Sequence, residues 1–185
     1  MPKRTRQAKR SIDFFSDYDG SWKAGFKKHL RLNLEVFFPG VAAIIDWTVP
    51  PVWKDKEIER IINQPGKKNR PVDLLVELRM KNGESLRILV HIEVQSSKDE
   101  SLPERLHLYN AGVFYTYGVR VITLAVLADL NPNWCPAEDL WQVGDDFESK
   151  LRFPTCKLIE KLDTDWKGVH SLPVEVARAQ IAALR

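Results

Sequence analysis

Two neighbouring segments of the chain alternate apolar and polar residues with the period of two that is typical of β-strands. In the segments 72–78 and 86–94 every even-numbered position is apolar, whereas the odd-numbered positions are mostly charged or polar. Each segment is therefore predicted to form a strand with one apolar face. Because the segments are close in sequence, we expect them to pair as an antiparallel hairpin that buries both apolar faces together.

The register of this hairpin follows from its apolar faces. Both faces carry even numbers, so the numbers of paired residues must add to an even total if both faces are to be buried on one side. A two-residue Asn82-Gly83 turn would give an odd total. We therefore predict a three- or five-residue loop, or a bulge beside Gly83. With a total of 166, Asp73 lies directly opposite Glu93, and their Cβ atoms are about 5 Å apart.

Two facing carboxylates at this distance indicate a metal site. They repel each other unless a cation lies between them, and Mg²⁺ binds one or two carboxylates while it keeps waters and phosphate oxygens. Such an ion polarises a phosphoryl group and lowers the pKa of a bound water. Gln95 is on the same odd-numbered face and is expected to orient that water or to contact the scissile phosphate, although an uncharged amide cannot neutralise a developing phosphorane.

The alternative interpretation is a solvated sheet face on which charged residues form cross-strand pairs. The residues on that face are Asp73, Glu77, Arg79, Arg87, His91 and Glu93. In this interpretation His91 is an ordinary polar residue of the face. Beside a metal site, it would instead contact the residues that bind the metal without binding the metal itself.

The rest of the pattern predicts a mixed sheet with helices packed on it. A helix is expected from Asp19 or Ser21 to about Phe38, where Pro39-Gly40 ends it. Its apolar stripe contains Trp22, Phe26, Leu30, Leu34 and Phe37. One short strand should precede Pro65.

A second helix is predicted over residues 102–117 and ends at Gly118, where a left-handed cap is favoured. The apolar run 119–127 predicts a strand buried on both faces. Residues 131–165 look irregular, and a last helix should follow Pro173 over residues 174–184. Four aromatic residues of the irregular stretch are expected to pack on the core: Trp134, Trp141, Phe147 and Phe153.

Asp73, followed at about twenty residues by Ile92-Glu93-Val94-Gln95 and preceded by a helix that carries Glu35, resembles the PD-(D/E)XK nuclease superfamily, with Gln in place of the usual Lys. More narrowly, the chain resembles the recombination-promoting nuclease/transposase family. The further stretches that carry this resemblance are Phe37-Phe38-Pro39, His91, Arg105, Tyr109, Tyr117-Gly118, residues 124–129, Asn131-Pro132-Asn133-Trp134 and residues 152–158, so that it covers roughly residues 18–185.

The resemblance implies an α/β (α+β) fold with a restriction-endonuclease-like core, in which helices flank a central mixed four-stranded sheet. It also implies that the protein cuts DNA with Mg²⁺. Asp73 and Glu93 match the metal-binding acids, and Gln95 matches the third motif position. The Val94 carbonyl would complete the metal shell. Glu35 matches the helical acid loosely; it is either a third metal ligand or a surface residue of its helix.

Basic residues mark the predicted DNA contacts. The loop that leads to Asp73 contains Lys67, Lys68 and Arg70, which we expect to clamp a phosphate. Arg105 follows the site on the next helix and either reaches a phosphate or forms a salt bridge with Asp99 or Glu77.

Charge is also uneven along the chain. The first ten residues carry a charge of +5, whereas the remaining 175 carry −2. This basic arm, residues 1–17, either binds the phosphate backbone or is a solvated terminus. Residues 18–185 are long enough for a single core and are expected to form one nuclease-like domain.

No apolar run reaches the ~20 residues of a membrane span, and no apolar segment follows the basic arm, so we expect neither a membrane segment nor a secretory signal. Cys135 and Cys156 fit neither a zinc knuckle nor a redox Cys-x-x-Cys motif, and reduced cytoplasmic thiols are expected. The sequence thus predicts a cytoplasmic Mg²⁺-dependent DNA endonuclease, with Mn²⁺ as an alternative metal and a homodimer as a compatible state. The competing prediction is a non-catalytic DNA-binding or interaction module on the same fold.

Overall fold

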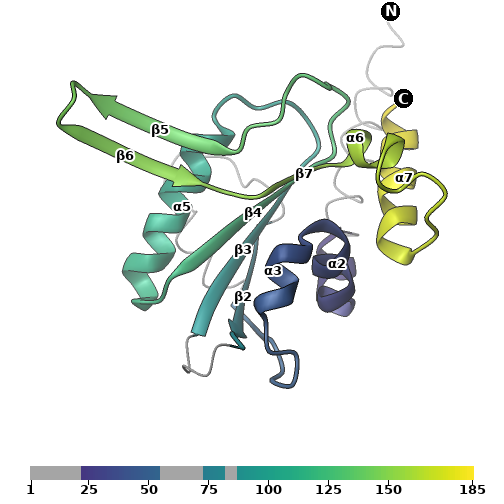
Figure 1. Ribbon diagram of the computed structural model, residues 1–185, viewed down its shortest axis with the longest axis horizontal. Helices are drawn as coiled ribbons and strands as arrows, with labels where there is room; N and C mark the ends of the chain where they lie inside the picture. Colours follow the sequence, from purple (N-terminus) through teal and green to yellow (C-terminus); the bar gives the residue numbers. More distant parts are fainter. Residues whose placement is uncertain (1–21, 55–72, 82–86) are drawn as a thin grey trace, which may run out of the picture.

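A computed structural model describes residues 22–54, 73–81 and 87–185 of the chain (Figure 1). Residues 22–28 are helical. The other helices are α2 (Leu30–Phe37), α3 (Pro39–Ile44), α5 (Leu102–Tyr117), α6 (Leu158–Asp163) and α7 (Leu172–Leu184). The strands are β1 (Val52–Trp53), β2 (Asp73–Arg79), β3 (Arg87–Gln95), β4 (Val121–Leu127), β5 (Glu138–Val143), β6 (Phe147–Arg152) and β7 (Thr155–Lys157). In this described part of the chain, no helix has the length and hydrophobicity needed to cross a membrane.

The main sheet is mixed, as predicted, and its strand order is β1-β2-β3-β4-β7. The pairs β1–β2 and β2–β3 are antiparallel, whereas β3–β4 and β4–β7 are parallel. The short strand expected before Pro65 is β1. The prediction of four strands is wrong, because the described residues form a sheet of five. The additional strand is β7, whose three residues are too few to show a periodic pattern.

The predicted register of the hairpin is confirmed. Asp73 pairs with Glu93, and the pairing continues without a slip to Arg79 and Arg87. This register is incompatible with a two-residue Asn82-Gly83 turn, because such a turn would shift one strand by one position. Residues 82–86 of the connecting loop lie outside the described residues.

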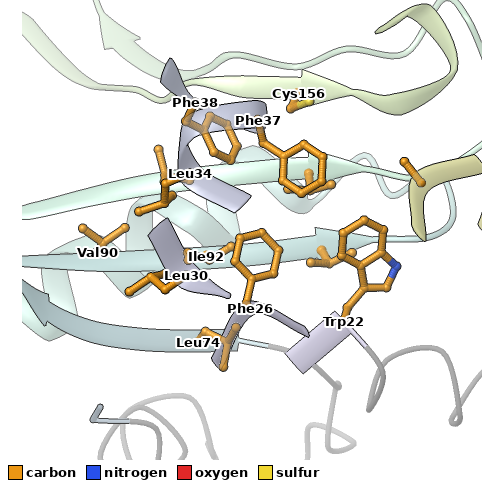
Figure 2. Close-up of a cluster of buried hydrophobic side chains, with 14 of the residues drawn as sticks. Trp22, Phe26, Leu30, Leu34, Phe37, Phe38, Leu74, Val90, Ile92 and Cys156 are labelled. Carbon is orange, nitrogen blue, oxygen red and sulfur yellow. The ribbon is translucent and has the colours of Figure 1, made fainter. Parts of the chain in front are cut away.

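The even-numbered face of the sheet is buried under residues 22–37 and α7. Figure 2 shows the aromatic and aliphatic side chains that fill this layer. All five residues of the predicted helical stripe are at most 5% exposed. The prediction of one continuous helix is wrong, because the structure divides it at His29 into residues 22–28 and α2. Helix α2 ends before Pro39 as expected, and Pro39 begins the short helix α3, because proline is well suited to a first helical position.

The odd-numbered face is covered by α5, so the interpretation of a solvated sheet face is wrong. His91 is 0% exposed and Glu93 is 4% exposed. Leu75, Leu89 and Val113 form a small apolar cluster between the sheet and the helix. The cause lies in the topology: β3 and β4 are parallel, so the chain must cross over between them, and the crossover helix lies on this face. The helix ends at Gly118, which has the predicted left-handed conformation (φ 63°).

The segment 131–165 is more regular than expected, since it contains β5, β6, β7 and α6. Strands β5 and β6 form a separate hairpin beside α5 (Figure 1). Trp134 and Phe153 are buried as predicted, but Trp141 and Phe147 are 60% and 47% exposed and lie against each other near the end of the hairpin. The hairpin was missed because neither of its strands has a clear buried face that would produce alternation. The last helix begins at Leu172, two residues before the predicted start.

Candidate functional site

The C-terminal end of β3 and the start of β2 form the candidate site. Glu93 and Gln95 are two residues apart on β3, and Asp73 opens β2 directly opposite Glu93. Residues directly opposite each other in an antiparallel pair have Cα atoms about 4.5 to 5.5 Å apart and share a face of the sheet. The backbone therefore brings the two acidic positions together on the face that α5 covers. For Asp73, only this backbone position belongs to the described part of the structure.

Arg105 occupies the centre of the site. Its Nη2 lies 2.7 Å from Oε1 of Glu93 and 3.1 Å from Oε1 of Gln95, and its Nη1 lies 2.6 Å from Oδ2 of Asp99. The side chains of Arg105 and Glu93 are 11% and 5% exposed. Helix α5 begins seven residues after Gln95, so its first turn places the guanidinium over the end of β3. The predicted salt bridge to Asp99 is confirmed, and the one to Glu93 is additional.

Asp99 anchors the guanidinium from the turn that precedes α5. Its Oδ1 accepts hydrogen bonds from the backbone N–H and the hydroxyl of Ser101, at 3.0 and 2.7 Å. Burial raises the pKa of Asp99, but the hydrogen bonds from Ser101 and Arg105 outweigh that effect and lower the pKa to about 2. For Arg105, burial lowers the pKa, while the neighbouring Glu93 and Asp99 raise it by more. Both Asp99 and Arg105 are therefore charged at neutral pH.

The amide of Gln95 is held at both ends. Its Nε2 donates to the carbonyl of Ser97 at 2.8 Å, and its Oε1 accepts from Arg105. These two contacts fix which way the amide points. The second contact also places the Arg105 guanidinium beside Gln95, the uncharged residue at the third motif position.

One other predicted ligand lies apart from this group. Glu35 is exposed on α2, over the opposite face of the sheet, and its carboxylate pairs with Arg31 at 2.7 Å. The structure therefore does not bring Glu35 to Glu93. Val94 lies between Glu93 and Gln95 on β3 with its side chain buried in the core of the even-numbered face, and the role of its carbonyl stays a prediction. Three predicted DNA-contacting residues, Lys67, Lys68 and Arg70, and the arm 1–17 lie outside the described residues.

Two carboxylate residues of this site, Glu93 and Asp73, could together hold a small divalent cation. Among the side chains that the structure describes, no group of three or more His, Cys, Asp or Glu forms a metal site. Mg²⁺, however, is commonly held by one or two carboxylates together with waters and substrate oxygens. The buried Glu93, paired in register with Asp73, is a donor set of that size.

Two buried features near this edge of the sheet were not predicted. His91 lies edge-on to the Tyr109 ring, with 5.9 Å between ring centroids, so it is a packed core residue and not an exposed polar one. Asp129 and Lys157 form a buried ion pair at 2.5 Å, with the ammonium over the Trp134 ring. The sequence contained only a weak signal that these two charged residues are buried. Asp129 follows an apolar run, and Lys157 precedes the apolar pair Leu158-Ile159.

Comparisons with protein-family models, with curated proteins and with solved structures found no match. Function is therefore inferred from the fold and the site alone.

Proposed function

We propose that this protein is a Mg²⁺-dependent DNA endonuclease on a restriction-endonuclease-like core, with Mn²⁺ as an alternative metal. The observation that carries the proposal is the register that pairs Asp73 with Glu93, two residues before Gln95. The order of helix, strands, helix and strand, with helices on both faces of a mixed sheet, also agrees with the resemblance to PD-(D/E)XK nucleases.

Each side chain of the site has a defined task in this proposal. Asp73 and Glu93 would hold the ion, which supplies Lewis-acid polarisation of the scissile phosphate when bound. Gln95, with its amide fixed by Ser97, positions the attacking water or a phosphate oxygen. Arg105 supplies the positive charge that Gln95 lacks, because its Nη2 touches Oε1 of both Glu93 and Gln95.

A preorganised cation of this kind is effective because little reorganisation is needed during the reaction. Asp99 restrains the Nη1 side of the guanidinium, so Arg105 remains in place if Glu93 turns towards an ion. The salt bridges also compensate for the desolvation of a buried Glu93 in the absence of metal.

A second candidate function is a non-catalytic DNA-binding or interaction module. The observation that favours it is the contact of 2.7 Å between Arg105 and Glu93, since a protein cation there competes with a metal ion for the same carboxylate oxygen. In this case Glu93 and Arg105 form a structural ion pair, and Gln95 is a polar residue of the site wall.

Cleavage of supercoiled plasmid distinguishes the two candidates. The assay compares wild type in EDTA, Mg²⁺ and Mn²⁺ with Asp73→Asn, Glu93→Gln and Gln95→Ala. We expect nicking in metal only, none in the two acid variants, and a rate at least about tenfold lower in Gln95→Ala, because positioned groups typically contribute one or more decades. Glu148→Gln removes an exposed carboxylate of the β5–β6 hairpin and is the matched control.

Metal binding is measured on the same proteins by thermal unfolding. Mg²⁺ at ten times its dissociation constant should contribute about 1.4 kcal/mol and raise Tm by roughly 3 to 6 °C. The rise should vanish in Asp73→Asn and persist in the hairpin control. DNA binding without cleavage in either metal would establish the module instead, and a wild type that neither cuts nor responds to Mg²⁺ or Mn²⁺ would refute the nuclease.

A further inference from the structure

Exposed apolar residues are concentrated on α5 and on the β5–β6 hairpin. In the described part of the chain, fourteen large apolar residues are exposed, and seven of them belong to these two elements. The exposed apolar surface is therefore gathered in one region, whereas on most monomers it is scattered. Six of the seven residues form two adjoining surfaces, which are here called the apolar corner: Leu108, Phe114, Tyr115, Trp141, Val143 and Phe147.

Helix α5 contributes the first surface of the apolar corner. Leu108 and Tyr115 are 54% and 91% exposed. They are seven residues apart, which is two helical turns, so they lie on one side of α5, opposite the buried residues Leu106 and Val113. Ala111 is exposed on the same side, between Leu108 and Tyr115. This side of α5 is therefore an apolar strip with a small residue at its centre, which allows a second helix to approach closely.

The β5–β6 hairpin contributes the second surface. Alternate residues of a strand share a face, so Trp141 and Val143 lie on the face of Asp139, and Val143 pairs with Phe147 across the ladder. Asp139 contacts His107 of α5 at 2.8 Å, so this face adjoins the helix, and the hairpin projects from there (Figure 1). The opposite face of the hairpin carries the charged residues of the two strands: Glu138, Glu148, Lys150 and Arg152.

The apolar corner has the size of a protein–protein interface. At about 150 to 250 Å² for each large side chain, the exposed fractions of its six residues correspond to about 500 to 900 Å². A standard interface buries about 800 Å² on each partner, whereas the largest apolar patch of a typical monomer is about 300 to 600 Å². A two-stranded hairpin is also only marginally stable unless one of its faces is packed. Both arguments favour a protein partner that covers the apolar corner.

We infer that the apolar corner binds a second copy of this chain, with the two α5 helices antiparallel about a two-fold axis near Ala111. Such an axis brings together residues that are equally far from it along the two helices. Leu108 then meets Tyr115 of the partner subunit. Glu104, in the first turn of α5, approaches Arg120 of the partner subunit, which lies just past the end of α5. This inference goes beyond the proposed function and does not depend on it.

The distribution of charge favours a second copy over a nucleic acid. Residues 138–152 contain five acidic and two basic residues, a net charge of −3, so the hairpin repels a polyanion. The centre of the antiparallel arrangement is uncharged, and its two ends each bring one acidic and one basic side chain together. The Arg120 guanidinium is held at its end by the Phe114 ring, at 5.2 Å from the centroid. The arrangement also places the hairpin of one copy beside the C-terminal half of the other α5, where Phe114 and Tyr115 are exposed.

Sedimentation equilibrium of the full chain in EDTA tests this inference. Wild type should associate reversibly to twice the mass of one chain. Tyr115→Glu and Trp141→Glu place a charge in the apolar corner, and each should raise the dissociation constant at least about 30-fold, because aromatic residues at the centre of an interface dominate its affinity. The matched control is Leu172→Glu, which alters a residue that is 51% exposed at the start of α7 and should keep the wild-type constant.

Reversal of two charges tests the antiparallel arrangement itself. Glu104→Arg and Arg120→Glu each create two like-charge contacts in a dimer, so each should weaken it severalfold. The variant with both changes restores opposite charges and should recover most of the lost affinity. Within one copy, the two residues are sixteen positions apart, or about 24 Å along a helix, so salt screens any direct interaction between them. Recovery therefore reports a contact between copies.

Three results would overturn the inference. The first is a wild type that stays monomeric at the highest concentration reached. The second is a dimer that tolerates Tyr115→Glu and Trp141→Glu as well as it tolerates Leu172→Glu. The third is a charge-reversed double variant in which the two losses simply add. Plasmid cleavage by the same preparations tests the proposed function separately, because a dimer that never cuts in metal supports the inference and refutes the nuclease, whereas a monomer that cuts does the reverse.

Discussion

Removal of Arg105 should destabilise the metal-free protein strongly. Arg105→Met keeps a long apolar side chain but leaves the carboxylates of Glu93 and Asp99, which are 5% and 22% exposed, without their shared cation. Breaking a buried pair by removing one partner typically costs about 3 to 5 kcal/mol, because the remaining charge stays desolvated. In a chain of this size, such a loss lowers Tm by roughly 6 to 20 °C.

Urea unfolding in EDTA measures this effect, and two further variants isolate its cause. Arg152→Met removes an arginine that pairs with Glu138 at 3.0 Å but is 76% exposed, so it should cost at most about 1 kcal/mol. Arg105→Met/Glu93→Gln also removes the more deeply buried of the two carboxylates that lose this cation, and it should recover about 2 kcal/mol relative to Arg105→Met. The reasoning is refuted if Arg105→Met is no more destabilising than Arg152→Met, or if Glu93→Gln brings no recovery.

Two further predictions concern titratable groups. The pKa of Asp99 is lowered to about 2 in the folded state. The free energy of unfolding of wild type should therefore exceed that of Asp99→Asn by about 2 kcal/mol above roughly pH 4, and this difference should disappear as the pH falls towards 2. Urea midpoints that keep a constant difference between the two proteins from pH 2 to 7 would contradict this. Burial raises the pKa of Cys156 to about 12, whereas Cys135 is exposed, so a chromogenic disulfide reagent should modify one thiol in the native protein and both after unfolding. Two thiols that react together in the native state would show that the core around Cys156 opens.

Much of the fold could be predicted because it depends on local periodicity. The even-numbered apolar residues of 72–78 and 86–94 required a register with an even total, and the observed pairing of Asp73 with Glu93 satisfies it. The helix 102–117 and its end at Gly118 follow from apolar spacing and from the conformational freedom of glycine. These signals arise within one element or between adjacent strands, so no distant contact is needed to read them.

The short and exposed elements could not be predicted, because they have no clear local periodicity. Strand β7 has three residues, and the β5–β6 hairpin exposes Trp141 and Phe147 where a core-facing pattern was expected. Sequence indicated that these aromatic residues are apolar, but the direction in which a hairpin extends depends on its contacts with the rest of the chain. One such contact joins His107 of α5 to Asp139 of β5 at 2.8 Å.

The sequence by itself determined which residue types stand at the site and that Asp73 and Glu93 face each other. Only the tertiary structure decided the environment of that pair. Whether a half-polar strand face meets water or a helix depends on the crossover between β3 and β4, and here α5 covers it and brings Arg105 to Glu93 across twelve residues of sequence. The same packing places Glu35 on the opposite layer. Burial and ion pairing arise from contacts between separate elements, and periodicity within one element does not specify them.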